Sequence, residues 1–333
     1  MAELIETFEQ YLEERYRPLE LEFISALARR LSKDIVEIRR WFNGECRKAI
    51  ADACEVQSRE EHPCSYMSVS LLNTSMINDE PTFQVDFYEQ EWVYGEPWCR
   101  RRFRAEYIFE RWRDFKLDAL DDRFYVRSRV HTVEIKSLFW GTLDKLTFLF
   151  ACYAKYFLPL LEYYDEFDGL IKAERFFITC GTYLDWQNKM FAVQPEIDLL
   201  NPDANDDATF QTVRKRIYRN QKFSDLDMRG CRFEDCIFDR FTFDGVSLAD
   251  GNFLRCRFIS TQFINVKVAG ADFIECYFRA CAFKDCTADP AHVADEYFAP
   301  LRLYHCYLLG LDFRDCDFDQ RVMLDCFEKE ASK

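Results

Sequence analysis

The sequence predicts an α+β amino-terminal region followed by a four-sided β-solenoid of about five coils over residues 221–320. Two observations predict the solenoid. Apolar residues recur at every fifth position, and a second series of mostly small residues lies two positions before each of them. A third observation predicts the amino-terminal region, because helical apolar spacing over residues 3–62 gives way to strand-like alternation near residue 63.

The five-residue series runs from Phe223 to Phe283, and every member is apolar. A period of five fits neither a helix, at about 3.6 residues, nor a strand, at about 2. It fits a coil in which each five-residue unit forms one side of a square, with successive coils stacked roughly 4.8 Å apart. The expected structural core of the solenoid consists of Phe233, Phe238, Phe243, Phe253, Phe258, Phe263, Phe273, Phe278, Phe283, Cys231, Cys236, Cys256 and Cys276.

This pattern, carried by segments 231–240, 256–260 and 271–285, resembles the pentapeptide repeat family. In that family a small residue and a polar residue precede Leu or Phe, and two variable positions follow. The resemblance covers residues 221–320 of the 333 residues. It implies a right-handed quadrilateral β-helix. Some members of the family resemble B-DNA in size and charge and bind DNA gyrase.

Nine of the fifteen cysteines lie from Cys231 onward, and all nine occupy the small inward position of the repeat. We expect Cys236, Cys256 and Cys276 to stack on one side of successive coils. The spacing of Cys231 and Cys236 also lies within the range of zinc sites, but the repeat generates this spacing and places the two residues on different sides of the coil. The cysteines are therefore predicted to be buried structural residues rather than metal ligands.

Two other sets of residues resemble metal sites only incompletely. The first set is Cys46, Cys54, His62 and Cys64. Its gaps are unlike those of closed zinc sites. The second set is Asp315, Asp317 and Asp319, which begin like a calcium loop but are followed by Gln320 where such a loop has Gly. Nucleotide-binding and nucleophile motifs are absent from the sequence, so we predict no catalytic residue, metal or cofactor.

The formal net charge of −15 argues against direct nucleic-acid binding and fits either solubility or a basic partner. The longest apolar run, residues 146–164, contains Lys155, Pro159 and Glu162, so it does not fit a membrane span. Fifteen cysteines and an acidic, amphipathic start unlike a signal peptide predict a reducing, cytoplasmic location.

Residues 1–62 are expected to form a helical segment, with Ser32 or Asp34 capping a helix that stops near Asn43 and Gly44. Residues 27–44 also resemble the helix-turn-helix of phage-repressor-type regulators. Lys33 lies where that motif normally has an apolar residue, and the acidic, aliphatic start of the second helix is poorly suited to reading bases. An ordinary helical hairpin is the preferred interpretation.

Residues 63–206 are expected to form an α+β domain. Alternation over 67–71 and 83–87 predicts a small antiparallel sheet, in which 92–94 begins a third strand. Aromatic-rich helices over 98–194 would cover this sheet, and the arginines at 100, 101, 102 and 104 would lie on a solvated face.

The third expected domain, residues 207–333, contains the solenoid and two accessory segments. Residues 195–205 suit a linker, and a helix over 207–219 would cap the open apolar end of the coil. The repeat falters over 287–300, where we expect an inserted loop or helix.

These observations favour a non-catalytic interaction protein that uses a rigid solenoid to bind another macromolecule. The partner is expected to be a protein, and its identity and the oligomeric state stay open. One alternative is a DNA mimic that modulates gyrase or a related topoisomerase. A second is an acidic, immunity-type inhibitor of a toxin.

Overall fold

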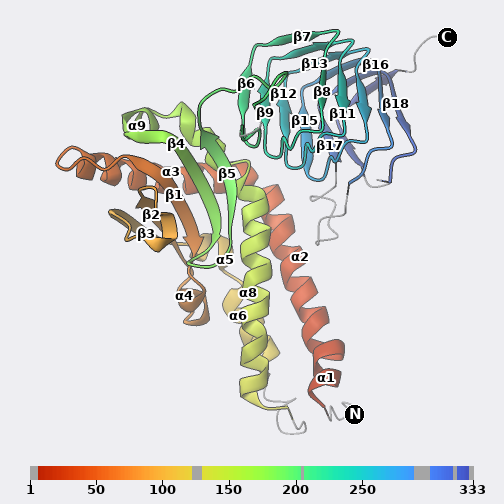
Figure 1. Cartoon of the computed structure of the whole chain (residues 1–333). Helices are drawn as coiled ribbons and strands as arrows, with labels where there is room; N and C mark the ends of the chain where they lie inside the picture. The colour runs from red at the N-terminus through yellow and green to blue at the C-terminus, as the bar shows by residue number, and fades with distance from the viewer. Residues whose placement is uncertain (1–6, 122–129, 204–205, 289–300, 318–320, 330–333) are drawn as a thin grey trace. The chain divides into compact units, whose positions relative to one another are not determined.

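The structure, a computed structural model, describes residues 7–121, 130–203, 206–288, 301–317 and 321–329. The chain falls into two compact units, Met1–Phe191 and Ala192–Lys333 (Figure 1). The expected boundaries differ from this division. Residues 7–62 pack with the sheet of the first unit, and the second unit begins before residue 207.

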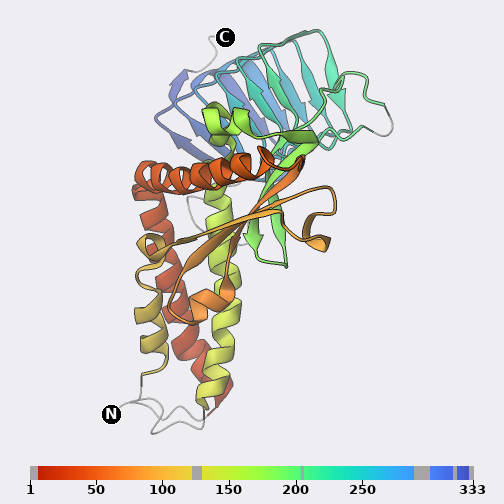
Figure 2. The same cartoon turned by 90° about the vertical axis from the view of Figure 1, so that its left-hand side faces the viewer.

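Three long helices dominate the first unit, and two of them, α2 and α8, run alongside each other in both views (Figures 1 and 2). His131 begins α8, where its backbone N–H donates to the Glu134 carboxylate at 2.7 Å and completes a capping box. The helices are α1 (Phe8–Tyr11), η1 (Leu12–Tyr16), α2 (Arg17–Lys33), α3 (Ile35–Gln57), α4 (Asn73–Ile77), η2 (Trp92–Tyr94), α5 (Glu106–Phe109), α6 (Trp112–Ala119), α8 (Thr132–Ala154), η3 (Leu158–Tyr163) and α9 (Asp165–Gly169).

Helix α3 shows that the helix end expected near Asn43 and Gly44 is wrong, and it also bears on the helix-turn-helix resemblance of residues 27–44. The helix does not stop at Asn43, because the Asn43 side chain is buried and donates to the carbonyl of Phe157 at 2.9 Å. The helix-turn-helix interpretation also fails. Ile38 and Phe42, on the would-be recognition helix, are fully buried, and α3 packs against β2 and β3.

A five-stranded mixed sheet, in the order β3-β2-β1-β4-β5, lies against these helices. Strand β2 pairs antiparallel with both β1 and β3, whereas β4 pairs parallel with β1. Phe83 lies 5.3 Å from Phe42 of α3 and 4.7 Å from Phe150 of α8, between ring centroids, so this face of the sheet meets the helices. The strands are β1 (Cys64–Leu71), β2 (Thr82–Tyr88), β3 (Cys99–Arg104), β4 (Lys172–Thr182) and β5 (Gln187–Val193).

The other face of the sheet is polar and nevertheless buried. Asp86 is fully buried, and it accepts from Arg100 Nε at 2.6 Å and from Gln84 Nε2 at 2.7 Å. Ser68 accepts from Trp92 Nε1 at 2.9 Å and bonds to Thr179 at 3.0 Å. Each buried polar group in this cluster thus has a partner, which is the condition for placing such groups away from water.

The predicted strands at 67–71 and 83–87 are confirmed, but the rest of the sheet was missed. Residues 92–94 form a 3₁₀ turn, and residues 99–104, 172–182 and 187–193 are strands rather than helix. The run of arginines hid the alternation of β3, in which Arg100 pairs with Asp86 on one face and Arg101 with Asp52 on the other. Short apolar runs do not distinguish a buried strand from a buried helix.

The second unit is a β-helix-like solenoid in which parallel strands stack on three faces of each coil (Figure 1). The first face contains β6 (Thr212–Arg214), β9 (Arg232–Glu234), β12 (Asn252–Leu254), β15 (Ala271–Ile274), β17 (Leu301–Tyr304) and β19 (Arg321–Leu324). The second contains β7 (Ile217–Arg219), β10 (Ile237–Asp239), β13 (Arg257–Ile259) and β20 (Phe327–Lys329). The third contains β8 (Lys222–Ser224), β11 (Thr242–Asp244) and β14 (Gln262–Ile264). Two longer strands, β16 (Tyr277–Lys284) and β18 (Tyr307–Arg314), continue from the second face to the third.

Strand register gives the length of each coil. Phe233 pairs with Phe253 and Phe253 with Phe273, a step of 20 residues. Phe273 then pairs with Leu303, which makes that coil ten residues longer than the others. The expected insertion at 287–300 coincides with this longer coil, but residues 289–300 themselves lie outside the described residues.

The expected capping helix at 207–219 is wrong, because β6 and β7 lie there as part of the first coil. Val213 and Tyr218 already follow the five-residue phase and pack against the solenoid core. The solenoid therefore begins one half-coil earlier than residue 221. The linker segment 195–203 contributes Leu199 to the same core.

Candidate functional site

The corners of the solenoid determine how its faces are presented. From Phe210 to Asp285, every fifth residue has a positive φ of about 50 to 71°. Gly, Asn and Asp tolerate this left-handed conformation best, and they occupy many of the corners, among them Asn220, Asp225 and Gly230. Each corner turns the chain from one face to the next.

The fourth face differs from the other three, because single bridges replace its strands. Asp227, Ser247, Lys267 and Thr287 form one parallel column of isolated bridges along the stack. The backbone groups remain paired, as the Ser247 N–H donates to the Leu226 carbonyl at 2.9 Å. The Lys267 and Thr287 N–H groups donate in the same way, to Val246 and Val266, so the side chains of this face decide what it can bind.

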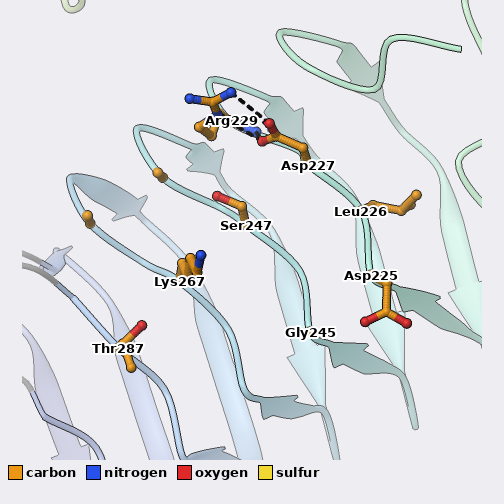
Figure 3. Close-up of a pocket in the computed structure, with 10 residues that line it drawn as sticks. Asp225, Leu226, Asp227, Arg229, Gly245, Ser247, Lys267 and Thr287 are labelled. Carbon is orange, nitrogen blue, oxygen red and sulfur yellow. Dashed lines mark hydrogen bonds and ion pairs between the residues drawn. The ribbon is translucent and has the colours of Figure 1, made fainter.

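A groove of about 470 Å³ lies along the fourth face (Figure 3). Its lining combines small residues with charged and hydroxyl side chains. The lining residues are Asp225, Leu226, Asp227, Arg229, Gly245, Ser247, Ala249, Lys267, Ala269 and Thr287. Gly245, Ala249 and Ala269 occupy positions at which other coils have longer side chains, so the surface is hollow here.

The charged groups of the groove differ in how they are paired. Arg229 and Asp227 form an ion pair, with Nη2 and Oδ2 2.7 Å apart, and the pKa of Arg229 is raised by this contact (Figure 3). Lys267 and Asp225 have no ion-pair partner among the described residues. The Asp225 carboxylate lies over Gly245, where an added Cβ would come within 2.5 Å of Oδ1. The groove thus offers one free cation and one free carboxylate to a ligand.

Elsewhere on the solenoid, opposite charges alternate along the stack. One corner column reads Lys215, Asp235, Arg255, Glu275, His305 and Asp325. Arg255 Nε lies 2.8 Å from Asp235 Oδ1, and this contact lowers the pKa of Asp235. On the first face, Arg302 pairs with the buried Asp272 at 2.6 Å. These columns do not form a continuous acidic surface.

The residues expected in the solenoid core all lie inside the coil. The nine phenylalanines at 233–283 and Cys231, Cys236, Cys256 and Cys276 are fully buried. Stacked rings lie close to parallel, as between Phe243 and Phe263, with centroids 4.8 Å apart and an angle of 1°.

The inward cysteines act as small hydrogen-bond donors to the coil below. Cys256 Sγ donates to the Phe233 carbonyl at 3.3 Å, and Cys276 Sγ donates to the Phe253 carbonyl at 3.2 Å. Thr261 makes the same contact, to Phe238, at 2.9 Å. Burial raises the pKa of Cys231 to about 12, so this thiol is inert at neutral pH.

Neither incomplete metal motif forms a site in the described part of the chain, where no group of three or more potential ligands converges. Cys46 and Cys64 are buried, and burial raises the pKa of both thiols. His62 instead bonds to Glu89 at 2.9 Å and Glu60 at 3.1 Å. Asp319 of the calcium-like run lies outside the described residues.

Sequence reasoning did not identify the groove. A signal was present, since Gly245, Ala249 and Ala269 interrupt the charged residues that occupy outward positions in other coils. The hollow becomes visible only when residues 20 apart are aligned in columns.

Residues 205–283, within the solenoid unit, match the family model described as the SV2A/B/C luminal domain. No curated protein matches the chain in sequence.

Solved structures of pentapeptide repeat proteins also resemble part of the chain. One is a trypsin-treated form of QnrB1, a plasmid-mediated fluoroquinolone resistance protein, with 16% identity over 35% of this chain and 80% of that one, and a TM-score of 0.15. Another is HetL of Nostoc sp. strain PCC 7120, involved in heterocyst differentiation regulation, with 11% identity over 37% and 86% of the two chains and a TM-score of 0.13. At these TM-scores the strand pairing described above, rather than either likeness, defines the fold.

The family match contradicts the cytoplasmic location expected from the sequence, because the model it fits describes a luminal domain. The expectation relied in part on the number of cysteines. Most of them are packed as small apolar residues, so their number reflects packing rather than the redox state of a compartment. Within the described residues, the helices are too short or too polar to cross a bilayer.

Proposed function

We propose that the protein is a non-catalytic binding scaffold that holds a protein partner in the groove of the fourth face. The observation that carries this proposal is the groove itself, with the unpaired Lys267 and Asp225 above a floor of small residues. Two exposed charges of opposite sign at one hollow, without an ion-pair partner among the described residues, favour a ligand that brings complementary groups to both.

The lining favours a protein segment over a small molecule or a substrate. Small-molecule sites are mostly apolar and enclose most of their ligand. This groove lies on the outside of the solenoid and is lined largely by polar side chains. Its lining contains no histidine or cysteine that could serve as a base or nucleophile.

The alternating charges favour this scaffold over a DNA mimic. A mimic of DNA needs regularly spaced negative charge along one surface. Columns such as Asp235 and Arg255 neutralise each other instead. We therefore expect no effect on gyrase supercoiling. An acidic inhibitor of a toxin is one form of the scaffold proposal, because the net charge of −15 favours a basic partner.

The test fills the groove and leaves the rest of the solenoid unchanged. Ser247→Tyr places a ring in the hollow, because Ser247 is half-buried in its lining. Thr242→Tyr is the matched control. Thr242 is also half-buried, lies in the same coil and precedes the inward Phe243 as Ser247 precedes the inward Leu248.

The full-length wild type and both variants are used as baits in extract of the native source, with partners quantified by mass spectrometry. We expect a protein that wild type and Thr242→Tyr retain equally and that Ser247→Tyr loses by roughly tenfold or more, since about 1.4 kcal/mol corresponds to a factor of ten. Lys267→Glu should weaken the same protein selectively. Equal retention by wild type and Ser247→Tyr would contradict the proposal.

A further inference from the structure

Two pairs of thiols are stacked at the carboxy-terminal end of the solenoid. The Asp317 N–H donates to the Cys286 carbonyl at 3.2 Å, which places Cys316 directly above Cys286. The Phe327 N–H donates to the Cys306 carbonyl at 2.9 Å, which places Cys326 above Cys306. Strands paired in this way lie roughly 4.8 Å apart, and disulfides join Cα atoms about 4.4 to 6.8 Å apart.

The members of each pair differ in burial. Cys316 and Cys326 are half-buried, whereas Cys286 and Cys306 are buried. Inside the solenoid, Cys236 and Cys256 have the same register but are both fully buried. Among the described coils of the solenoid, the end pairs alone combine a thiol that a reagent can reach with a second thiol one coil away.

The end coil also has more freedom to adjust than the interior coils. Among the described strands, β19, β20 and the second half of β18, Leu311–Arg314, pair on one side only. Cys316 follows this half of β18, and Cys326 lies between β19 and β20. A disulfide requires the two Cβ atoms to approach to about 3.5–4.5 Å, closer than stacked strands hold them. A coil with one neighbour can move by this amount, whereas contacts on both sides oppose the movement of a coil between two neighbours.

We propose that Cys316 with Cys286, and Cys326 with Cys306, are disulfide-forming pairs that fasten the last coil to the coil before it. This modification site is independent of the groove on the fourth face. The reduced form keeps four hydrogen bonds from these thiols to backbone carbonyls, such as Cys326 Sγ to Leu303 at 3.3 Å. Oxidation exchanges these weak bonds for two covalent cross-links.

The oxidant is a small-molecule disulfide such as oxidised glutathione. The thiolate of Cys316 attacks one glutathione sulfur, the glutathione S–S bond breaks, and one reduced glutathione leaves with a proton. Cys286 then attacks the mixed disulfide through its thiolate, and the second reduced glutathione leaves. Each pair of protein thiols thus loses two protons and two electrons, which reduce one oxidised glutathione to two thiols. Cys326 and Cys306 react in the same way.

The order of attack follows from burial. Burial raises the pKa of Cys286 to about 12, so this thiol is almost entirely protonated at neutral pH and is shielded from the reagent. Cys316 and Cys326 are half-buried, so the reagent reaches them first, and the buried Cys286 and Cys306 then resolve the mixed disulfides.

The test uses the full-length, fully reduced protein, incubated with oxidised glutathione under native conditions. Remaining thiols are alkylated before tryptic digestion and mass spectrometry. Cleavage after Lys284, Arg302, Arg314, Arg321 and Lys329 separates the four cysteines into peptides 285–302, 303–314, 315–321 and 322–329. We expect cross-links joining 285–302 to 315–321 and 303–314 to 322–329, each lighter by two hydrogens than its reduced peptides.

Two controls distinguish these pairs from general thiol reactivity. Cys236 and Cys256 should stay reduced over the same period, although they share the register of the end pairs. In Cys286→Ser and Cys306→Ser, the glutathione adduct should persist on Cys316 and Cys326 respectively, because the resolving thiol is gone. Oxidised wild type should show slower amide exchange in β19 and β20 than reduced wild type.

The proposal is overturned if Cys316 and Cys326 of the wild type end as free thiols or as glutathione adducts. A cross-link between Cys316 and Cys326 themselves would also overturn it. Oxidation of Cys236 with Cys256 at an equal rate would remove the role assigned to the end coil. Because the wild-type map alone decides the pairing, a variant that fails to fold does not affect the test.

Discussion

The two units bury phenylalanine in different ways. In the solenoid, phenylalanine rings one coil apart are nearly parallel from Phe233 onward, as for Phe253 and Phe273, with centroids 4.6 Å apart and an angle of 5°. In the first unit, most phenylalanine pairs meet edge to face or tilted, as for Phe42 and Phe83 at 75°, and Phe23 with Phe115 is a stacked exception at 15°. Repetition in one direction produces the first arrangement, and packing of helices on a twisted sheet produces the second. The solenoid core can therefore be inferred from spacing, whereas the core of the first unit cannot.

Phe258→Asp should break the solenoid and leave the first unit folded. Phe258 is fully buried between Phe238 and Phe278, with ring centroids 5.1 and 4.7 Å away, and a carboxylate there has no partner. We expect a loss of at least about 5 kcal/mol in the free energy of unfolding of the solenoid. Thermal melting combined with hydrogen exchange measures the two units separately.

Ser260→Asp is the control for this change, because Ser260 is an exposed corner residue with a φ of 52° that Asp tolerates. It should melt within about 0.5 kcal/mol of wild type. A melting curve for Phe258→Asp that matches wild type would refute the inward position of this column.

Arg100→Met should destabilise the first unit, as Phe258→Asp destabilises the solenoid. It removes the ion-pair partner of Asp86, a fully buried carboxylate, although the Arg100 side chain itself is 37% exposed. Leaving a buried carboxylate without its cationic partner costs about 3–5 kcal/mol. Urea unfolding monitored by exchange in β2 and β3 would give the value.

The same substitution at Arg255 provides the contrast on the solenoid. Arg255 and Asp235 are 46% and 38% exposed at their side chains, and such pairs contribute about 0–1 kcal/mol. Equal losses in the free energy of unfolding for Arg100→Met and Arg255→Met would contradict the importance of Arg100 as the partner of the buried Asp86.

Ala280→Gly should stabilise the solenoid slightly, although glycine usually destabilises strands. Ala280 is exposed and has a φ of 52°, in which a Cβ is unfavourable by about 1–2 kcal/mol. Glycine removes this penalty, but its greater freedom in the unfolded chain costs about 0.5–1 kcal/mol on folding. We therefore expect a net gain of up to about 1 kcal/mol in the free energy of unfolding. Ala282→Gly, two residues along in β16, should have the opposite sign. If both destabilise alike, the corner geometry is not left-handed.

The smallest effect concerns pH and is confined to the first unit. Hydrogen bonds to the carboxylates of Glu89 and Glu60 raise the pKa of His62 above 6.5, so the folded state binds the proton more tightly than the unfolded state. The stabilisation is complete below pH 6.5 and is lost as the pH rises through the folded-state pKa. His62→Gln should remove this slope from urea midpoints measured between pH 5.5 and 8.5 (roughly one unit below and two above the unperturbed value). An unchanged slope in the variant would assign the pH dependence to other groups.

Most of the solenoid followed from the sequence, and most of the first unit did not. The five-residue phase located residues 221–283 and their inward positions, because each unit of the coil contacts only its neighbours. The same phase extends to Val213 and Tyr218, but the basic residues beside them led to the prediction of a helix there. In the first unit, β4 pairs with β1, which lies about a hundred residues earlier in the chain, and β5 pairs with β4. The residues of β4 and β5 by themselves do not indicate this pairing.

The sequence by itself determined a stack of coils with phenylalanine and cysteine inside, since periodic spacing places the same side chain at the same site in every coil. Only the tertiary structure decided which outward residues become neighbours. It aligned Asp225, Ser247 and Lys267 along one groove and set Cys316 and Cys326 above buried thiols. These contacts join residues 20 to 30 positions apart, and whether a coil contains 20 or 30 residues is settled by strand pairing.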